Sequence, residues 1–247
     1  MRLKTDETCK DANITANSST LNYPVSNVVD SRLSTIFKTD SSTTATIVFD
    51  CAAAVNVTSI IIANHNISSG VTTLKLQGNA TDSWGTPSVD ETLTWASGHI
   101  IKDITQASYR YWRIQIIDAG NSDGFISIGR AWIGDLYQAP DIAPAINHNR
   151  NSESVKSISA SGQGYQDTRY KYSIVTATWP KLTHTEKAEI FAIFDAIDIG
   201  TPFFVTFEET QSDIGTLYVT LDNDSINMSL LSNVNYYTAG INFRQEV

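Results

Sequence analysis

Positive charge and long apolar runs are both scarce in this sequence. Lys and Arg account for 17 of its 247 residues against 26 Asp and Glu, so the formal net charge is −9. Proteins bind nucleic acids through basic side chains that displace counterions from phosphates, so this composition argues against a nucleic-acid partner. Residues 1–20 have no apolar run after their charges, and no window is apolar enough to span a membrane. We therefore expect no membrane partner and no secretory signal, with synthesis in the cytoplasm.

Cysteine is equally scarce, because Cys9 and Cys51 are the only two thiols in the sequence. The two residues would form a disulfide if their strands lie side by side. Since cytoplasmic proteins keep their thiols reduced and the sequence has no export signal, we expect two free thiols.

Motifs that carry catalysis are missing as well. The sequence contains no Gly-x-Ser-x-Gly elbow, His-Glu-x-x-His pair, Cys-x-x-Cys pair or Gly-x-Gly-x-x-Gly loop. A histidine that binds a metal usually has a second ligand at short spacing. The four histidines instead lie in separate turns or at the start of a predicted helix: His65, His99, His148 and His184. We predict a protein that is not an enzyme, with no catalytic residue and no catalytic cofactor.

The residues that are abundant favour β structure. Hydrophobic residues make up 41% of the chain and charged residues 17%, with many Ser, Thr, Val, Ile and Tyr, which suit pleated surfaces joined by polar turns. The strongest strand is 109–117, where Trp112, Ile114 and Ile116 alternate with polar residues. The turn at 121–124 predicts that 125–133 returns as the hairpin partner of this strand. Short strands at this spacing predict a β-sandwich.

One stretch of the sequence predicts an amphipathic helix. Thr183 and Glu186 have the spacing of a capping box, in which each side chain satisfies a backbone N–H of the first turn. Ile190, Phe191 and Phe194 then recur at helical spacing and are predicted to face the core. Gly200 and Pro202 end the pattern, so we predict a helix over 184–198 that covers a sheet.

The prolines and polar residues of 139–154 mark a predicted linker between two domains. The first domain, 1–138, is predicted to be a jelly-roll β-sandwich. The second domain, 155–247, is predicted to be a smaller antiparallel β domain with the helix. Within the strand 169–179 the apolar residues change parity, which predicts a bulge near Ile174.

Short motifs in the first half resemble the discoidin or coagulation factor 5/8 type C family. They are Asn27-Val28-Val29-Asp30, Ser34-Thr35 followed by Phe37, Phe49-Asp50, and Tyr111-Trp112-Arg113-Ile114 before Ile126-Ser127-Ile128. The resemblance covers roughly residues 10–136. It implies a galactose-binding-like sandwich whose end loops bind sugars or lipids. It also implies a structural calcium near Asn27, Asp30 and Thr35, although the usual Asp-Gly-Asp of that loop reads Asp30-Ser31-Arg32 here.

The order of motifs over most of the chain resembles minor tail or tail-tip proteins of tailed bacteriophages. The carrying motifs are Ile128-Gly129-Arg130-Ala131-Trp132-Ile133-Gly134-Asp135, a Pro/Asn-rich joint, and Trp179-Pro180 opening a helix that leads to Pro202-Phe203-Phe204-Val205. This resemblance implies a structural protein of the virion tail that forms homo-oligomers and docks onto other tail proteins. Low charge and abundant Tyr are consistent with extensive permanent contacts.

Four aromatic residues are candidates for holding a ligand, because sugars are bound by aromatic faces and a few aimed polar groups. They are Trp84, Trp95, Tyr109 and Tyr111, which lie at or beside loops of the predicted sandwich. The alternative is that the tryptophans close the ends of the sandwich while the tyrosines lie at a subunit contact. The sequence thus leaves two functions open: assembly of a phage tail, or recognition of a cell-surface glycan by an adhesion module.

Overall fold

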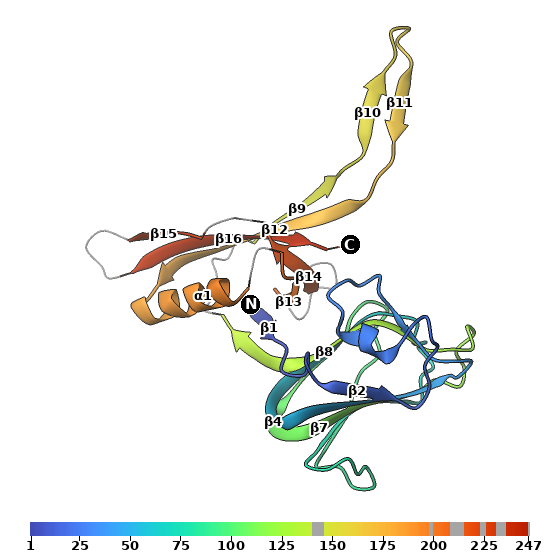
Figure 1. The fold of residues 1–247 in the computed structure, drawn as a ribbon. Coiled ribbons are helices and arrows are strands. Elements are labelled where there is room, and N and C mark those ends of the chain that lie inside the picture. The colour runs from blue at the N-terminus through green and yellow to red at the C-terminus, as the bar shows by residue number, and fades with distance from the viewer. Residues whose placement is uncertain (140–145, 198–199, 208–214, 223–225, 231–235, 247) are drawn as a thin grey trace. The chain divides into compact units, whose positions relative to one another are not determined.

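The computed structural model describes residues 1–139, 146–197, 200–207, 215–222, 226–230 and 236–246. The chain divides into two compact units, which are a sandwich unit, Asp6–Leu136, and a second unit that combines Met1–Thr5 with Tyr137–Val247. Both units are built from antiparallel strands, and the described part of the chain has one α-helix (Figure 1). This confirms the predicted mainly β fold with a single helix. No helix in the described ranges is long and apolar enough to cross a membrane.

Two long, bent strands organise the sandwich unit. They are β4 (Thr44–His65) and β7 (Ile100–Ile117), which pair with each other over most of their length. Their register shifts after Asp50, close to Ala52, whose φ of +60° lies in the left-handed region. Because both strands bend there, each one contributes to both layers of the sandwich.

The remaining strands extend the two layers. One layer has the order β2-β4-β7-β5-β6, and in the other β4 pairs with β8 and β8 with β3. Their bounds are β2 (Asn13–Ala16), β3 (Phe37–Lys38), β5 (Thr73–Asn79), β6 (Val89–Thr92) and β8 (Ser127–Gln138), and a short 3-10 helix, η1, spans Val25–Val29. The alternation predicted for β7 is confirmed, since Trp112, Ile114 and Ile116 are all fully buried between the layers.

The hairpin predicted between 109–117 and 125–133 is wrong. β8 pairs with β4 and β3, whereas the C-terminal half of β7 lies between β4 and β5. The predicted turn does form, and Gly124 adopts a φ of +73° in it. The segment carries the chain from one layer of the sandwich to the other, so a local turn signal did not identify the partner strand.

The second unit is a curved antiparallel sheet covered by the helix. Its strand order is β1-β13-β14-β16-β12-β9, with β15 paired to β16. A separate two-stranded ribbon, β10–β11, continues from β9 and β12 (Figure 1). The bounds are β1 (Arg2–Asp6), β9 (Asn147–Ser152), β10 (Val155–Ile158), β11 (Gly164–Asp167), β12 (Lys171–Leu182), α1 (His184–Ala196), β13 (Phe203–Thr206), β14 (Thr216–Leu221), β15 (Asn227–Leu230) and β16 (Tyr237–Gln245).

The observed units differ from the predicted boundaries in two places. Residues 1–5 were expected in the first domain, but Arg2, Leu3 and Lys4 pair with β13 of the second unit. The predicted linker 139–154 contains β9, which pairs along β12. β9 reads Asn-His-Asn-Arg-Asn-Ser and has no buried residue, so it lacks the hydrophobic alternation by which a strand is predicted.

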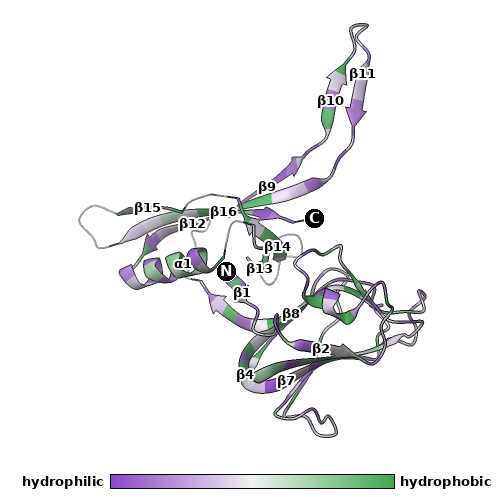
Figure 2. Ribbon diagram, viewed as in Figure 1, coloured by the Kyte–Doolittle hydropathy of each residue, from purple (hydrophilic) through white to green (hydrophobic). Residues whose placement is uncertain are grey.

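The capping box of the helix is confirmed. Glu186 Oε2 accepts a hydrogen bond from the Thr183 backbone N–H at 2.7 Å, and Thr183 Oγ1 accepts one from the Glu186 N–H at 3.3 Å. Ile190 is buried and Phe194 packs against the apolar cluster of the unit. Phe191, expected in the core, is instead half-buried, with the Lys187 ammonium 5.5 Å from its ring centroid. Figure 2 shows that the helix carries both hydrophilic and hydrophobic residues.

The bulge predicted near Ile174 is wrong. β12 pairs in continuous register with β16 from Ile174 to Trp179, and with β9 from Lys171 to Thr176. The register shift lies between Trp179 and Leu182, where Pro180 has no N–H to donate to the ladder.

Candidate ligand-binding site

Trp84 lies over the outer face of the layer that contains β5 and β7, and contacts within the protein hold its ring in place. Its indole Nε1 donates to Asp82 Oδ1 at 2.6 Å, and the Arg113 guanidinium lies 4.4 Å from its ring centroid. Arg113 Nε in turn donates to Gln77 Oε1 at 2.8 Å. One face and the N–H of this indole are therefore already in contact with the protein itself.

The polar groups around Arg113 also bind one another. Gln77 Nε2 donates to Asp90 Oδ1 at 2.8 Å, and Lys75 Nζ lies 2.8 Å from Asp90 Oδ2. Lys75, followed by Gln77, lowers the pKa of the Asp90 carboxyl. This outer face is thus a closed network that leaves few hydrogen-bonding groups for a ligand.

Tyr111 lies on the same outer face and has internal partners too. The Arg110 guanidinium lies 4.8 Å from its ring centroid and binds both carboxylate oxygens of Asp50, at 2.7 and 2.8 Å. Arg110 is the main reason that the pKa of Asp50 falls to about 2, and a hydrogen bond with Tyr111 contributes.

Trp95 and Tyr109 point toward the core rather than toward solvent. Trp95 Nε1 donates to the Ile67 carbonyl at 2.8 Å, which joins two end loops of the sandwich. Tyr109 packs edge-on against Trp112 with ring centroids 6.2 Å apart. Both residues border the buried apolar cluster of the unit. The structure brings Trp84 and Tyr111 to one face of the sandwich but does not gather all four aromatic residues at one place.

The loop for which calcium was expected is held by its own hydrogen bonds. Asn27 Nδ2 donates to the Ile36 carbonyl at 2.8 Å, and the Thr35 N–H donates to the Arg32 carbonyl at 3.0 Å. Both oxygens of Asp30 accept from the Arg32 guanidinium, at 3.1 and 2.9 Å. Arg32 lowers the pKa of the Asp30 carboxyl for that reason.

A second guanidinium, that of Arg130, also contacts this loop. Arg130 Nη1 donates to the Val29 carbonyl at 3.1 Å and to the Asp30 carbonyl at 2.6 Å, while Nη2 binds the Glu7 carboxylate. The side chains of Arg130 and Glu7 are only 7% and 8% exposed. Burial raises the pKa of Glu7 to about 7, although Arg130 opposes this shift. Carbonyls that accept from a guanidinium do not suit Ca²⁺, because the two cations would repel each other at that distance.

Within the described ranges, no group of three or more His, Cys, Asp or Glu side chains is arranged to hold a metal ion. His65 lies close enough to His99 for the two rings to interact electrostatically. Burial lowers the pKa of His99, and the charge of His65 lowers it further. His65 Nδ1 accepts from the Ile67 N–H at 3.2 Å, so this ring serves to shape a loop.

The end of the sandwich that carries loops 17–24, 39–43, 66–72 and 118–126 is fixed by buried polar groups. Asp118 is fully buried, and its carboxylate accepts from the Ser68 N–H at 2.7 Å, the Ser68 hydroxyl at 2.6 Å and Asn121 Nδ2 at 3.1 Å. Asn66 Nδ2 donates to Asp123 Oδ2 and to the Phe125 carbonyl, both at 2.9 Å. These contacts join two loops that are distant in the sequence.

Thr39 joins the loop before β4 to the same assembly. The Ile126 N–H donates to Thr39 Oγ1 at 2.9 Å, and the Thr39 N–H donates to the Ile126 carbonyl at 2.9 Å. Because a buried polar group costs free energy unless it is paired, these satisfied contacts hold the loops in one arrangement.

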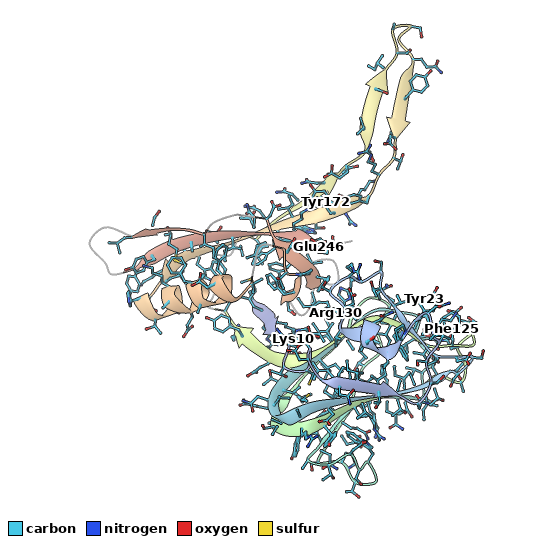
Figure 3. All side chains as sticks on the ribbon, viewed as in Figure 1. Lys10, Tyr23, Phe125, Arg130, Tyr172 and Glu246 are labelled. Carbon is cyan, nitrogen blue, oxygen red and sulfur yellow. The ribbon has the colours of Figure 1, made fainter. Side chains whose placement is uncertain are left out.

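An aromatic and cationic cluster lies on this fixed end. The Lys38 ammonium is 3.5 Å from the ring centroid of Phe125, and the backbone N–H of Lys38 donates to the backbone carbonyl of Tyr23 at 3.2 Å. Tyr23 is 41% exposed, and Figure 3 labels it beside Phe125 at the same end of the unit. Among the residues that the structure describes, the Lys38 ammonium has no carboxylate partner. We call Tyr23, Lys38 and Phe125 the end cluster.

No sequence pattern predicts the end cluster. Tyr23 and Lys38 lie in a stretch for which no strand was predicted, and Phe125 was assigned to a hairpin strand. The three residues carry no shared motif, so the sequence offered only one usable signal, an aromatic residue next to turn chemistry in each loop.

A small cavity lies within the core of the second unit. It is apolar, has a volume of about 10 Å³ and is lined by Leu3, Ile190, Phe194, Ile197, Phe203, Leu221, Ile226, Ile241 and Phe243. A volume of this size is at the lower limit for a single water molecule, so it is a packing gap rather than a ligand pocket.

Comparison with solved structures finds carbohydrate-binding modules. The chain is similar to the lectin domain of lectinolysin in complex with Lewis B antigen, at 11% identity and a TM-score of 0.44, over 53% of this chain and 96% of that one. It is also similar to the family 32 module of NanJ from Clostridium perfringens in complex with galactose, at 18% identity and a TM-score of 0.42, over 56% and 100%. A third is a fucose-binding module from Streptococcus pneumoniae, at 12% identity and a TM-score of 0.43, over 52% and 94%.

No protein-family model and no curated protein sequence matches the chain. The phage-tail role and the homo-oligomer remain predictions from the sequence. The two antiparallel layers described above agree with the predicted β-sandwich.

Proposed function

We propose that the protein binds carbohydrate, with the sugar held by the end cluster of the sandwich unit. The observations that carry this proposal are the 41% exposure of Tyr23 and a Lys38 ammonium that lies over the Phe125 ring and has no carboxylate partner in the described residues. An aromatic face can stack on the apolar face of a sugar ring, while an ammonium donates hydrogen bonds to its hydroxyl oxygens.

The rigidity of the supporting loops favours this site. Asp118, Asn66 and Thr39 fix the loops below the end cluster, so little conformational entropy is lost when a ligand binds. The outer face around Trp84 is less suited, because Arg113, Gln77 and the other polar groups there are bonded to one another. The solved structures that this chain resembles are complexes with Lewis B antigen and galactose, which indicates the class of ligand to test.

A glycan array with the full chain and three variants tests the proposal. Tyr23→Ala should remove most of the binding, and Lys38→Met should weaken it by about tenfold, equivalent to loss of one charged hydrogen bond of about 1.5 kcal/mol. Trp84→Ala is the matched control, since it removes an aromatic ring from the other candidate surface, and it should bind like the unmodified protein.

Two outcomes would contradict the proposed site or function. Loss of binding in Trp84→Ala with full binding in Tyr23→Ala would move the sugar to the outer face of the sheet. Absence of any glycan signal for the unmodified chain, with folding verified by circular dichroism, would remove the carbohydrate-binding function.

A further inference from the structure

The two thiols of the chain lie in contact within the sandwich unit. The Sγ atoms of Cys9 and Cys51 are 2.9 Å apart, although the residues are separated by 42 positions in the sequence. A disulfide requires an S–S distance of about 2.0 Å, so the two sulfur atoms need to approach by less than about 1 Å. Both residues are free cysteines here. We propose that Cys9 and Cys51 are a site of reversible oxidation, closed by small-molecule disulfides such as oxidised glutathione.

The backbone holds both cysteines in place for this reaction. The Cys9 N–H donates to the Ile133 carbonyl at 3.3 Å, and the Cys9 carbonyl accepts from the Ala12 N–H at 3.2 Å. Cys51 lies within β4, next to Asp50, whose carboxylate accepts from the Ala52 N–H at 2.9 Å. Because neither segment has to move far, the loop-closure entropy of bringing the thiols together is already lost in folding.

The surroundings assign different roles to the two thiols. Cys9 is 1% exposed, whereas Cys51 is half-buried and can be reached by a small molecule. The hydrogen bond with Cys9 lowers the pKa of the Cys51 thiol, whereas the same bond and burial raise the pKa of Cys9. The thiolate is the attacking species in thiol–disulfide exchange. Cys51 is therefore the attacking residue and Cys9 the resolving residue.

The exchange proceeds in two balanced steps. The Cys51 thiolate attacks one sulfur of the small disulfide, forming a mixed disulfide and releasing one small thiolate. Cys9 then gives its proton to that thiolate or to water and attacks Cys51 Sγ, which releases the second small thiol. The protein loses two electrons and two protons, and the small disulfide is reduced to two thiols.

The bond would cross-link residues near the beginning of the sandwich unit to the bend of β4. A cross-link that closes a loop of this length stabilises a fold mainly by restricting the unfolded chain. We expect the melting temperature of the unit to rise by about 5–10 °C on oxidation, and to return after treatment with a dithiol. Oxidation of the two thiols does not depend on carbohydrate binding.

Incubation of the full chain with oxidised glutathione, followed by alkylation under denaturing conditions and mass spectrometry, tests this proposal. The unmodified chain should lose both thiols and yield peptides joined through Cys9 and Cys51, without bound glutathione. Cys9→Ser should stop at a mixed disulfide on Cys51. Cys51→Ser should leave the buried Cys9 unreacted.

Three results would overturn the proposal. They are a stable glutathione adduct on Cys51 in the unmodified chain, two thiols that remain free, and reaction of Cys9 in Cys51→Ser as fast as in the unmodified chain. Because the first two are read from the unmodified chain, they hold even if a variant fails to fold.

Discussion

Within each unit, the layers and the loops are stabilised by different kinds of contact. In the sandwich unit, charged and amide side chains such as Arg130, Asp118 and Asn66 bind the backbone of loops, while an apolar cluster fills the space between the layers. In the second unit the helix and sheet meet through an apolar cluster that includes Ile190 and Phe243. Directional contacts fix loops, whereas apolar contacts fix layers, and this explains why the candidate ligand site lies on the sandwich.

The largest effect is expected from removal of the cation that supports the loop after η1. Arg130→Gln removes the donor to the Val29 and Asp30 carbonyls and leaves Glu7 without its ionic partner. We expect a loss of about 3–5 kcal/mol in the free energy of unfolding of the sandwich unit. Peptide-level hydrogen exchange should show this loss in the sandwich unit while the second unit keeps its protection.

Arg32→Gln is the matched control for this prediction. Arg32 also binds the loop, but its side chain is 73% exposed, and exposed ion pairs contribute little. A cost for Arg32→Gln as large as that for Arg130→Gln would contradict the contrast between buried and exposed guanidinium groups.

In the second unit, the loss in free energy of unfolding should instead depend on how deeply the truncated apolar side chain is buried. Ile190→Ala removes a side chain that is 1% exposed and should cost about 2–5 kcal/mol, by lost burial and a new cavity. Phe191→Ala is the control, because Phe191 is half-buried and lies outside the apolar cluster. Urea denaturation measures the free energy of unfolding of both variants, and hydrogen exchange measures the protection of α1 in each. Equal losses would mean that the helix packs through a different face.

These contrasts also explain which features could be predicted from the sequence. The capping box of Thr183 and Glu186 and the alternation around Trp112 arise within one element, so local spacing encodes them. The pairing of Arg2–Lys4 with β13 is non-local, and nothing near Arg2 identifies the partner strand.

The candidate binding residues were harder to predict than the fold. Trp84 and Tyr111 look suitable in the sequence because they are aromatic residues near turns. Only the structure reveals the Arg113 and Asp50 contacts that occupy their surroundings. Lys38 and Phe125 meet through folding of distant loops, so no sequence spacing brings them together.

The pH dependence of stability should distinguish the two units further. The pKa of Glu7 rises from an ordinary 4.5 to about 7 on folding, because the carboxyl is buried. Between these values the folded protein binds the proton and the unfolded chain does not, so stability falls as pH rises from 4.5 to 7. Over this pH range, the free energy of unfolding of the unmodified protein should fall by up to about 3 kcal/mol relative to that of Glu7→Gln. Urea titrations at several pH values measure the difference, and parallel curves for the two proteins would contradict the raised pKa.

The smallest effect is expected from removal of the β10–β11 ribbon of the second unit. Every residue of both strands is exposed, including Ile158 at 78%, and none belongs to the apolar cluster of that unit. A lone two-stranded ribbon is at best marginally stable in water, so it depends on the sheet while the sheet does not depend on it. Replacing 155–167 by a short Gly-Ser turn should change the free energy of unfolding by less than about 0.5 kcal/mol, measured by urea denaturation.

Val175→Ala, a truncation of a fully buried residue where β12 enters the sheet, should cost more than deletion of the whole ribbon. The reverse order would mean that the ribbon is part of the core of the second unit, and that stability in this unit does not follow apolar burial.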